Sequence, residues 1–256
     1  MKKRFQIFDV EKFKKKLQNV VVTSKRRQTF ERFFDKNQRN VFKSSMLKSF
    51  VENNLNMAET ALQYGTYYHI YNRGTNGEVL FKHEKYYAEF LDLYKEFIIP
   101  VVDTLAYCLM SNHFHLLIRV KDEHEIRTFK ELNMFKKDES KQNPLKKPTP
   151  SNQFKHLFLT YTKRINKAYN RTGSLFEHPF ERRMIETENY LRDCVAYIHN
   201  NPVKDGFAKK VTDYKWSSYN AITSDKPTLI EREFVLDLFG GGENFKYFHG
   251  DFENKE

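Results

Sequence analysis

The sequence of 256 residues predicts an α+β fold in which helices pack on a central antiparallel sheet. Three observations lead to this prediction. Segments with the two-residue alternation of a strand occur between segments with the three- and four-residue apolar spacing of a helix. Two of the strand-like segments are joined by a short polar turn, which favours an antiparallel hairpin. Aromatic residues make up 16% of the chain, far too many for a disordered chain.

The first half of the predicted sheet domain contains three strands and one helix. Residues 66–72 alternate bulky aromatic and β-branched side chains before a glycine-containing turn, which predicts a strand. Residues 82–97 carry apolar side chains at helical spacing, and Pro100 follows them. Residues 101–110 and 113–120 then read as two strands of a hairpin.

A charged, proline-containing stretch follows the hairpin. Residues 121–152 lack periodicity, so we expect a surface loop after a short helix at 125–132. The next helix is clearer, because apolar side chains from Phe154 to Ala168 fall on one helical face. Its end is expected near residues 170–173, where asparagine and glycine are typical of a helix C-terminus.

The last predicted strand and helix complete the sheet domain. Residues 180–187 alternate as a strand, and Thr187 is a suitable N-cap for a helix over residues 188–200 that Pro202 would end. The element order is therefore strand, helix, strand, strand, helix, strand, helix. This order predicts a ferredoxin/RRM-like sheet with helices packed on it.

Charge divides the chain unevenly. Its formal net charge is +11, of which residues 1–63 supply +9 from 15 basic and 6 acidic side chains. We therefore expect three parts: a basic helical N-terminal extension at 1–63, the sheet domain at 64–222 and a C-terminal tail at 223–256. The basic balance favours a polyanionic partner. The extension could be a solvated appendage or an arm that tracks DNA.

Two cysteines, Cys108 and Cys194, have neither the spacing of a metal site nor the density of a disulfide scaffold. A reducing cytoplasm is therefore the expected location. No apolar run approaches the roughly 18 residues that a membrane span needs, so no membrane association is expected.

The predicted strand 113–120 carries the first candidate site. On a strand His113 and His115 point to the same face, whereas on a helix they would lie roughly 200° apart. Two neutral imidazoles side by side can hold a divalent ion. The same pattern is also common in proteins without such a site, so a metal would need further ligands.

The predicted helix 188–200 carries the second candidate. Tyr197 and Asn201 are four residues apart and share a helical face. A phenol has a pKa near 10, so it attacks a phosphate only when that phosphate is polarised. An amide oxygen of Asn201 could complete a metal site. Alternatively, Tyr197 is an interior aromatic and Asn201 caps the helix before Pro202.

Four ordered motifs then suggest a family. MSNHFHLLI, RTGSLFEHPFERRMIETENYL, AYIHNNPVKDGF and YKWSSY, within residues 66–219, resemble the single-tyrosine HUH transposases of the insertion-sequence-200-like class. The likeness is greatest to the REP-associated tyrosine transposases. It implies that His113 and His115 bind a divalent metal, that Asn201 is a third ligand and that Tyr197 is the nucleophile. Mixed nitrogen and oxygen ligands suit Mn²⁺, with Mg²⁺ as the abundant alternative.

The resemblance also implies a substrate and a reaction. Single-stranded or hairpin DNA would be cut through a 5′-phosphotyrosine bond with release of a 3′-hydroxyl, and the strand would then be transferred. Both a monomer and a homodimer are compatible with it. Candidate DNA contacts are basic side chains on or beside the predicted strands and helix: Arg73, Lys163, Arg164, Arg182 and Arg183. Each of them could also be a solvated surface charge. Weaker histidine candidates are His69, His156, His178 and His199.

Two other functions compete with this prediction. A domesticated, non-cutting, sequence-specific DNA-binding protein could keep the fold, but it would not need all of His113, His115, Tyr197 and Asn201. A two-histidine phosphoesterase would need two separated His-x-Thr or His-x-Ser motifs, and the sequence offers a single His-x-His.

Overall fold

The computed structural model describes residues 61–134, 143–177 and 180–250. The chain divides into one unit at residues 1–61 and another at 62–256. The predicted basic extension at 1–63 therefore lies almost entirely outside the described residues.

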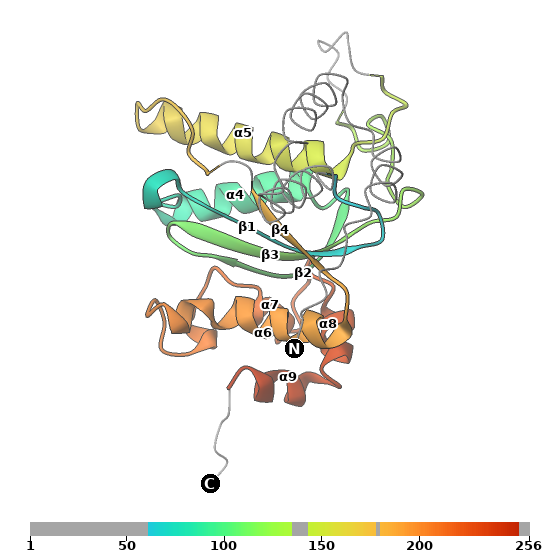
Figure 1. Ribbon diagram of the computed structural model, residues 1–256, viewed down its shortest axis with the longest axis vertical. Coiled ribbons are helices and arrows are strands. Elements are labelled where there is room, and N and C mark those ends of the chain that lie inside the picture. Colours follow the sequence, from blue (N-terminus) through green and yellow to red (C-terminus); the bar gives the residue numbers. More distant parts are fainter. Residues whose placement is uncertain (1–60, 135–142, 178–179, 251–256) are drawn as a thin grey trace, which may run out of the picture. The chain divides into compact units, whose positions relative to one another are not determined.

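A four-stranded antiparallel sheet forms the centre of this unit (Figure 1). Its strands are β1 (Tyr67–Arg73), β2 (Val102–Leu109), β3 (His113–Val120) and β4 (Glu181–Ile185). They lie in the order β2-β3-β1-β4, and each neighbouring pair is antiparallel. The predicted α+β fold, with its ferredoxin/RRM-like sheet, is confirmed.

Helices cover both faces of the sheet (Figure 1). Two helices lie on one face: α4 (Glu84–Phe97) and α5 (Pro150–Ala168). The other face is covered by α6 (Glu188–Lys204), α7 (Tyr219–Ile222), α8 (Arg232–Leu238) and α9 (Gly242–Phe248). Two short 3-10 helices connect elements, η1 (Thr75–Gly77) and η2 (Val211–Asp213).

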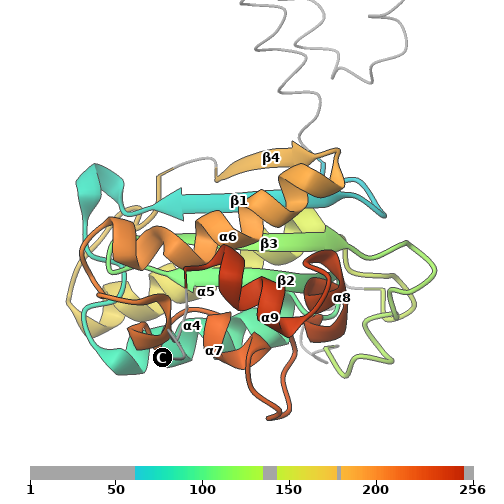
Figure 2. The ribbon, with the colours of Figure 1, turned by 90° about the horizontal axis from the view of Figure 1, so that it is seen from below.

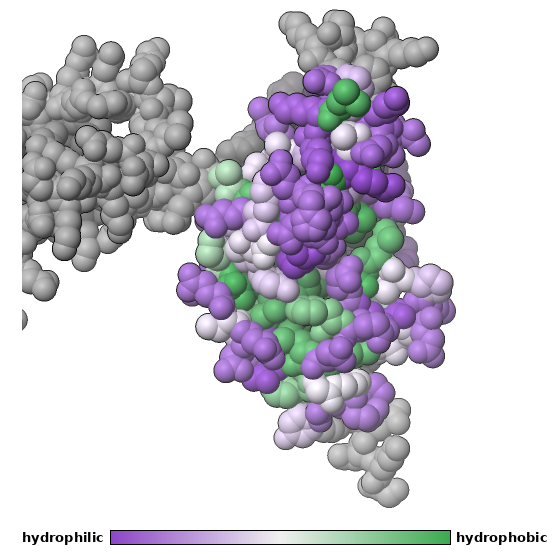
Figure 3. Space-filling view, turned by 90° about the vertical axis from the view of Figure 1, so that its right-hand side faces the viewer, coloured by the Kyte–Doolittle hydropathy of each residue, from purple (hydrophilic) through white to green (hydrophobic). Residues whose placement is uncertain are grey.

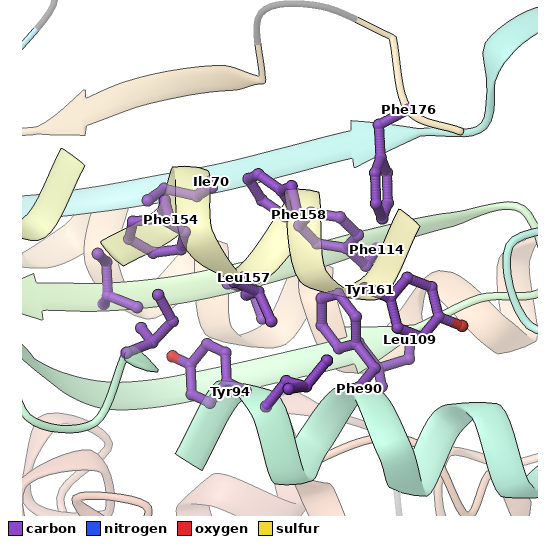
Figure 4. Packing of buried hydrophobic residues seen from close by; sticks show 14 of the residues in the cluster. Ile70, Phe90, Tyr94, Leu109, Phe114, Phe154, Leu157, Phe158, Tyr161 and Phe176 are labelled. Carbon is purple, nitrogen blue, oxygen red and sulfur yellow. The ribbon is translucent and has the colours of Figure 1, made fainter. Parts of the chain in front are cut away.

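The face under α4 and α5 is an aromatic core (Figure 4). Phe114 of β3 is fully buried, and its ring centroid lies 5.4 Å from that of Phe90 and 5.7 Å from that of Phe158. Tyr161 is buried with them, and its hydroxyl donates to the carbonyl oxygen of Leu80 at 2.9 Å. Alternate residues of β3 are thereby committed to packing, so the intervening residues must face α6.

The opposite face, over which α6 runs (Figure 2), carries a second core. Leu117 of β3 is buried there with Val195 and Ile198 of α6. The segment that the sequence analysis treated as a C-terminal tail contributes to this core, because Val235 of α8 and Phe245, in α9, are also fully buried. Each of these helices has seven residues, which is too short for a helical spacing of apolar residues to stand out in the sequence.

Two local expectations were wrong. Residues 125–132 form turns rather than a helix, since the Glu125 carboxylate accepts from the Asp122 backbone N–H at 2.7 Å and pairs with Arg119 at 2.9 Å. Helix α6 does not end before Pro202 but continues to Lys204. Proline removes one backbone donor, and in the last turn of a helix that loss is small.

Helix α6 begins as its sequence predicts. The side chain of Thr187 caps it by accepting from the backbone N–H of Tyr190 at 3.3 Å. This bond satisfies one of the orphan donors at the helix start. None of the described helices combines the length and apolar content needed to cross a membrane.

One side of the molecule gathers hydrophobic residues in an area bordered by hydrophilic ones (Figure 3). A groove of about 440 Å³ opens between the start of β1, the start of α6 and α8, where Tyr67, Leu191 and Phe234 line it. Glu186 and Asp237 also line this groove. Because carboxylates repel phosphates, the groove is unsuited to a polyanion.

Gly74 follows β1 and provides the first prediction. A Cβ at this position would lie 1.9 Å from the carbonyl oxygen of Glu78, while the Gly74 N–H donates to the carbonyl oxygen of Asn112 at 2.8 Å. Gly74→Ala should therefore lower the free energy of unfolding by about 1–3 kcal/mol in urea denaturation. Gly242→Ala is the control, because its Cβ would meet nothing within 4 Å. Equal stability of the two variants would contradict the packing described here.

Candidate functional site

His113 and His115 project from the same face of β3, as expected for a strand. Their ring centroids are 5.2 Å apart and their planes are nearly perpendicular. Arg73 and Tyr71 of β1 are their respective partners in the register. The strand pair β1–β3 therefore fixes both the spacing of the imidazoles and the residues beside them.

Each imidazole makes a hydrogen bond through its Nδ1 atom. The Nδ1 of His113 lies 2.8 Å from Oδ1 of Asn112, and the Nδ1 of His115 lies 2.9 Å from Nε2 of His69. The Nε2 atoms are consequently the ones that could bind a ligand. Nε2 of His113 lies 3.9 Å from Oδ2 of Asp205 at the end of α6.

Burial holds these imidazoles neutral. It lowers the pKa of His115 to about 3, with further lowering by His69 and His113. Burial, and the charge of Arg183, lower the pKa of His69 to about 4. Burial also lowers the pKa of His113, although Asp205 opposes this shift. A neutral imidazole keeps a lone pair that can accept a metal ion or a hydrogen bond.

His69 is a residue of this site that the sequence analysis ranked low. It is buried, and Tyr71 packs beside it with ring centroids 4.9 Å apart. The sequence signal that could have indicated His69 as a site residue is its position on the same face of the predicted first strand as Tyr71. His156 lies on α5, on the other side of the sheet, and His178 lies outside the described residues.

Tyr197 of α6 comes next to the imidazoles. Its ring centroid is 5.6 Å from that of His115 and 6.0 Å from that of His69, both edge-on. The side chain is 44% exposed, and Nζ of Lys204 lies 5.9 Å from the ring centroid. Ile198 is buried beneath α6, so its neighbour Tyr197 lies at the side of the helix. A ligand from solvent could reach it there.

Asn201 lies one turn beyond Tyr197 and is buried. Its amide nitrogen donates to the carbonyl oxygen of Tyr197 at 2.9 Å, so the amide oxygen is the atom that could reach a metal. Over residues 61–134, 143–177 and 180–250, no three His, Cys, Asp or Glu side chains form a metal-binding group. A metal on His113 and His115 would therefore need an amide, water or substrate oxygen as well.

Two of the predicted DNA contacts lie beside the imidazoles. Arg73 is opposite His113 in the register and its Nε donates to Oε1 of Glu177 at 2.9 Å. Arg183 is opposite His69, with its Cζ 5.1 Å from the ring centroid of Tyr190.

The other three predicted contacts lie on the opposite face of the sheet. Arg182 is next to Arg183 on β4, so its side chain points toward α5, and its Cζ is 5.2 Å from the Phe180 ring centroid. Lys163 and Arg164 are on α5 itself, and Arg164 pairs with Glu89 of α4 at 2.9 Å. The structure does not bring these three to the imidazole pair.

Comparison with known proteins supports the resemblance seen in the motifs. No family model matches the chain. A protein of Haemophilus influenzae (strain ATCC 51907 / DSM 11121 / KW20 / Rd), named as a candidate REP-associated tyrosine transposase, is 24% identical over 144 residues. The match covers 56% of this chain and 70% of the relative. The chain is thus similar to a REP-associated tyrosine transposase, as the motifs predicted.

Solved structures are also among the proteins to which this chain is similar. A REP-associated tyrosine transposase bound to a REP hairpin is 15% identical, with a TM-score of 0.44, covering 65% of this chain and 85% of that one. A bacterial tRNA(His) guanylyltransferase-like protein in complex with GTP is 10% identical, with a TM-score of 0.32, covering 63% and 77%. At such scores neither likeness bears on the function of this chain.

The buried imidazoles predict acid sensitivity. Their pKa values lie below the ordinary 6.5, so below about pH 6.5 the unfolded chain binds more protons than the folded protein. The free energy of unfolding of the metal-free protein should therefore fall between pH 7 and 5, by up to about 1.4 kcal/mol per pH unit for each buried imidazole. Urea denaturation in EDTA at several pH values measures this.

His69→Gln should make the fall shallower, because it removes one titrating group. Asn152→Gln, at an exposed position on α5, changes no titrating group and should keep the wild-type slope. A fall as steep in His69→Gln as in the wild type would show that His69 does not titrate as described.

Proposed function

We propose that this protein cleaves and rejoins single-stranded or hairpin DNA, with Tyr197 as the nucleophile. The observation that carries the proposal is the position of the Tyr197 ring, 5.6 Å from that of His115 within one chain. The similarity to the Haemophilus influenzae protein supports it. Transposition is the process that such cutting and rejoining would serve.

The residues present fit a divalent metal ion. Nε2 of His113 and of His115, with the amide oxygen of Asn201, would hold Mg²⁺ or Mn²⁺. The hydrogen bonds that the two Nδ1 atoms donate, from His113 to Oδ1 of Asn112 and from His115 to Nε2 of His69, are the kind of outer contact that orients metal-binding imidazoles. When bound, the ion would polarise the phosphate that is attacked.

The bond changes are made by Tyr197 and the DNA. The phenol oxygen forms a bond to phosphorus while the bond from phosphorus to the 3′-oxygen breaks. The phenol gives its proton to the solvent that reaches its exposed side, and the departing 3′-oxygen takes a proton from water. The new phosphodiester joins Tyr197 to the 5′ end, so attack by another 3′-hydroxyl restores Tyr197 and joins the strands.

Basic side chains beside the imidazoles suit the phosphates of the strand. Arg73 and Arg183 flank His113 and His69 on the same face of the sheet. The exposed edge of Tyr197 and the ring of Tyr190 could stack on unpaired bases. Lys163, Arg164 and Arg182 would contact DNA only where it passes to the α5 face.

The nucleophile is tested with a pool of hairpin oligonucleotides that carry randomised single-stranded flanks and a label at the 3′ end. With Mn²⁺, the wild type should retain the label on denaturing gels as a covalent adduct, because the 3′ fragment carries the phosphate. Tyr197→Phe should abolish the adduct, whereas Tyr71→Phe, beside the same imidazoles, should retain it. An adduct at the wild-type level in Tyr197→Phe would refute the assignment. DNA binding without any adduct in the wild type would favour the non-cutting alternative.

The metal site is tested without the reaction, by titrating Mn²⁺ into the protein and following free Mn²⁺ by electron paramagnetic resonance. His113→Ala should weaken binding at least about tenfold, and His69→Leu should weaken it about 10–100-fold through loss of the hydrogen bond to His115. His69→Gln, whose amide oxygen can accept that bond, should restore most of the affinity. His156→Ala is the control. Unchanged binding in His113→Ala would exclude the imidazole pair as the site.

A further inference from the structure

A second group of buried imidazoles lies away from the first. His199 of α6 is fully buried, with its Nε2 2.7 Å from Oγ of Ser218 and its Nδ1 2.9 Å from Nε2 of His249. Ser218 precedes α7 and is also fully buried, and His249 follows α9. Polar groups this deep in a core are costly unless each of them is hydrogen-bonded.

The hydrogen bonds of this group have a definite direction. The Nδ1 of His249 faces the carbonyl oxygen of Phe245 at 2.7 Å, so it must carry the proton. With both imidazoles neutral, its Nε2 accepts from Nδ1 of His199, and Nε2 of His199 accepts from the hydroxyl of Ser218, which also lies 3.3 Å from the carbonyl oxygen of Tyr107. Oγ of Ser218 in turn accepts from the backbone N–H of Tyr107 at 2.9 Å. One continuous chain of donors therefore runs from β2 through α6 to α9.

This chain joins the two parts of the candidate site. His199 lies two residues from both Tyr197 and Asn201 on α6, on the buried side of that helix. At the other end, Tyr107 of β2 precedes Cys108, which pairs with His115 in the β2–β3 register. The buried chain thus connects the helix that carries the phenol to the strand pair that carries the imidazoles.

Its members come from separate parts of the sequence. His199 belongs to the AYIHNNPVKDGF motif and Ser218 to YKWSSY, whereas His249 lies beyond residue 219, where the resemblance ends. Figure 2 shows α9 next to α6, and Figure 1 shows that α9 is farther from the sheet than α6. Burial, together with His249, holds the pKa of His199 well below its ordinary value, which favours a neutral His199.

We propose that His249 is a positioning residue, which through His199 and Ser218 holds α6 at the distance from β3 that the attack by Tyr197 requires. It rests on the proposed function, and it makes α9, the last helix of the described residues, necessary for cutting. A purely stabilising role would instead change the unfolding midpoint and leave the folded protein fully active.

The test compares His249→Leu, which removes the acceptor for His199, with His249→Gln, whose amide oxygen can replace Nε2. Unfolding midpoints are measured first, so that each comparison is made where both variants are folded. His249→Leu should form the Tyr197 adduct about tenfold more slowly at saturating hairpin DNA, because it leaves a buried donor unpaired. Its dissociation constant for that DNA should not change, and His249→Gln should regain a rate close to that of the wild type.

Amide hydrogen exchange of residues 197–201 gives a readout that does not depend on cutting. Exchange should be about tenfold faster in His249→Leu than in the wild type or His249→Gln. This measurement keeps the proposal separate from the proposed function: if the wild type forms no adduct, the cutting mechanism fails while the positioning of α6 is still measured.

Two results would overturn the proposal. One is amide hydrogen exchange at the wild-type rate in α6 of folded His249→Leu. The other is an equal loss in the rate of adduct formation in His249→Leu and His249→Gln. Should His249→Leu fail to fold, Ser218→Ala takes its place, since it removes the donor to Nε2 of His199 at little cost in volume. Wild-type exchange in Ser218→Ala would then be the contradicting result.

Discussion

The structure depends on the alternation of side chains along β3. Phe114 and its alternate neighbours fill the aromatic core under α4 and α5, which leaves His113 and His115 on the face beneath α6. A slip of one residue in the β1–β3 register would put the imidazoles into that core and its phenyl rings beneath α6. The site is therefore specified by the same packing that specifies the fold.

Burying uncharged imidazoles in this way has a consequence for stability. His69, His115 and His199 all have lowered pKa values because burial disfavours their charged forms. Each buried ring is balanced by a hydrogen bond to another side chain, so the two groups form connected networks rather than isolated polar atoms. The burial that makes the protein sensitive to acid also keeps the imidazoles uncharged at neutral pH, the form that can accept a metal ion or a hydrogen bond.

Much of the sheet was predictable because its strands and first helices have strong periodic patterns. The strand at 113–120 was predicted with the bounds it has in the structure, and the helix that carries Tyr197 began where its N-cap indicated. The imidazole pair and Tyr197, chosen as candidates from spacing and motifs, lie together in the structure. Periodicity along one segment is local information, and these predictions needed nothing more.

What the sequence could not show is which segments lie side by side. His69 contacts His115 only through the β1–β3 register, which no single segment encodes. Arg182 could not be separated from Arg183 without knowing which face of β4 points to α6. Helices α8 and α9 were missed because they are short and gain their stability from packing on the rest of the core rather than from their own pattern.

The proposed cleavage requires that the phenol of Tyr197 and the imidazole pair form a single site within one chain. Paramagnetic broadening tests it most directly, by adding Mn²⁺ to protein whose tyrosine rings are isotopically labelled and identifying the Tyr197 signal by its loss in Tyr197→Phe. We expect Mn²⁺ bound through His113 and His115 to broaden the signals of Tyr197 and Tyr71 first and to leave that of Tyr161, in the opposite core, sharper. A Tyr197 signal that stays as sharp as that of Tyr161 while Mn²⁺ is bound would contradict it.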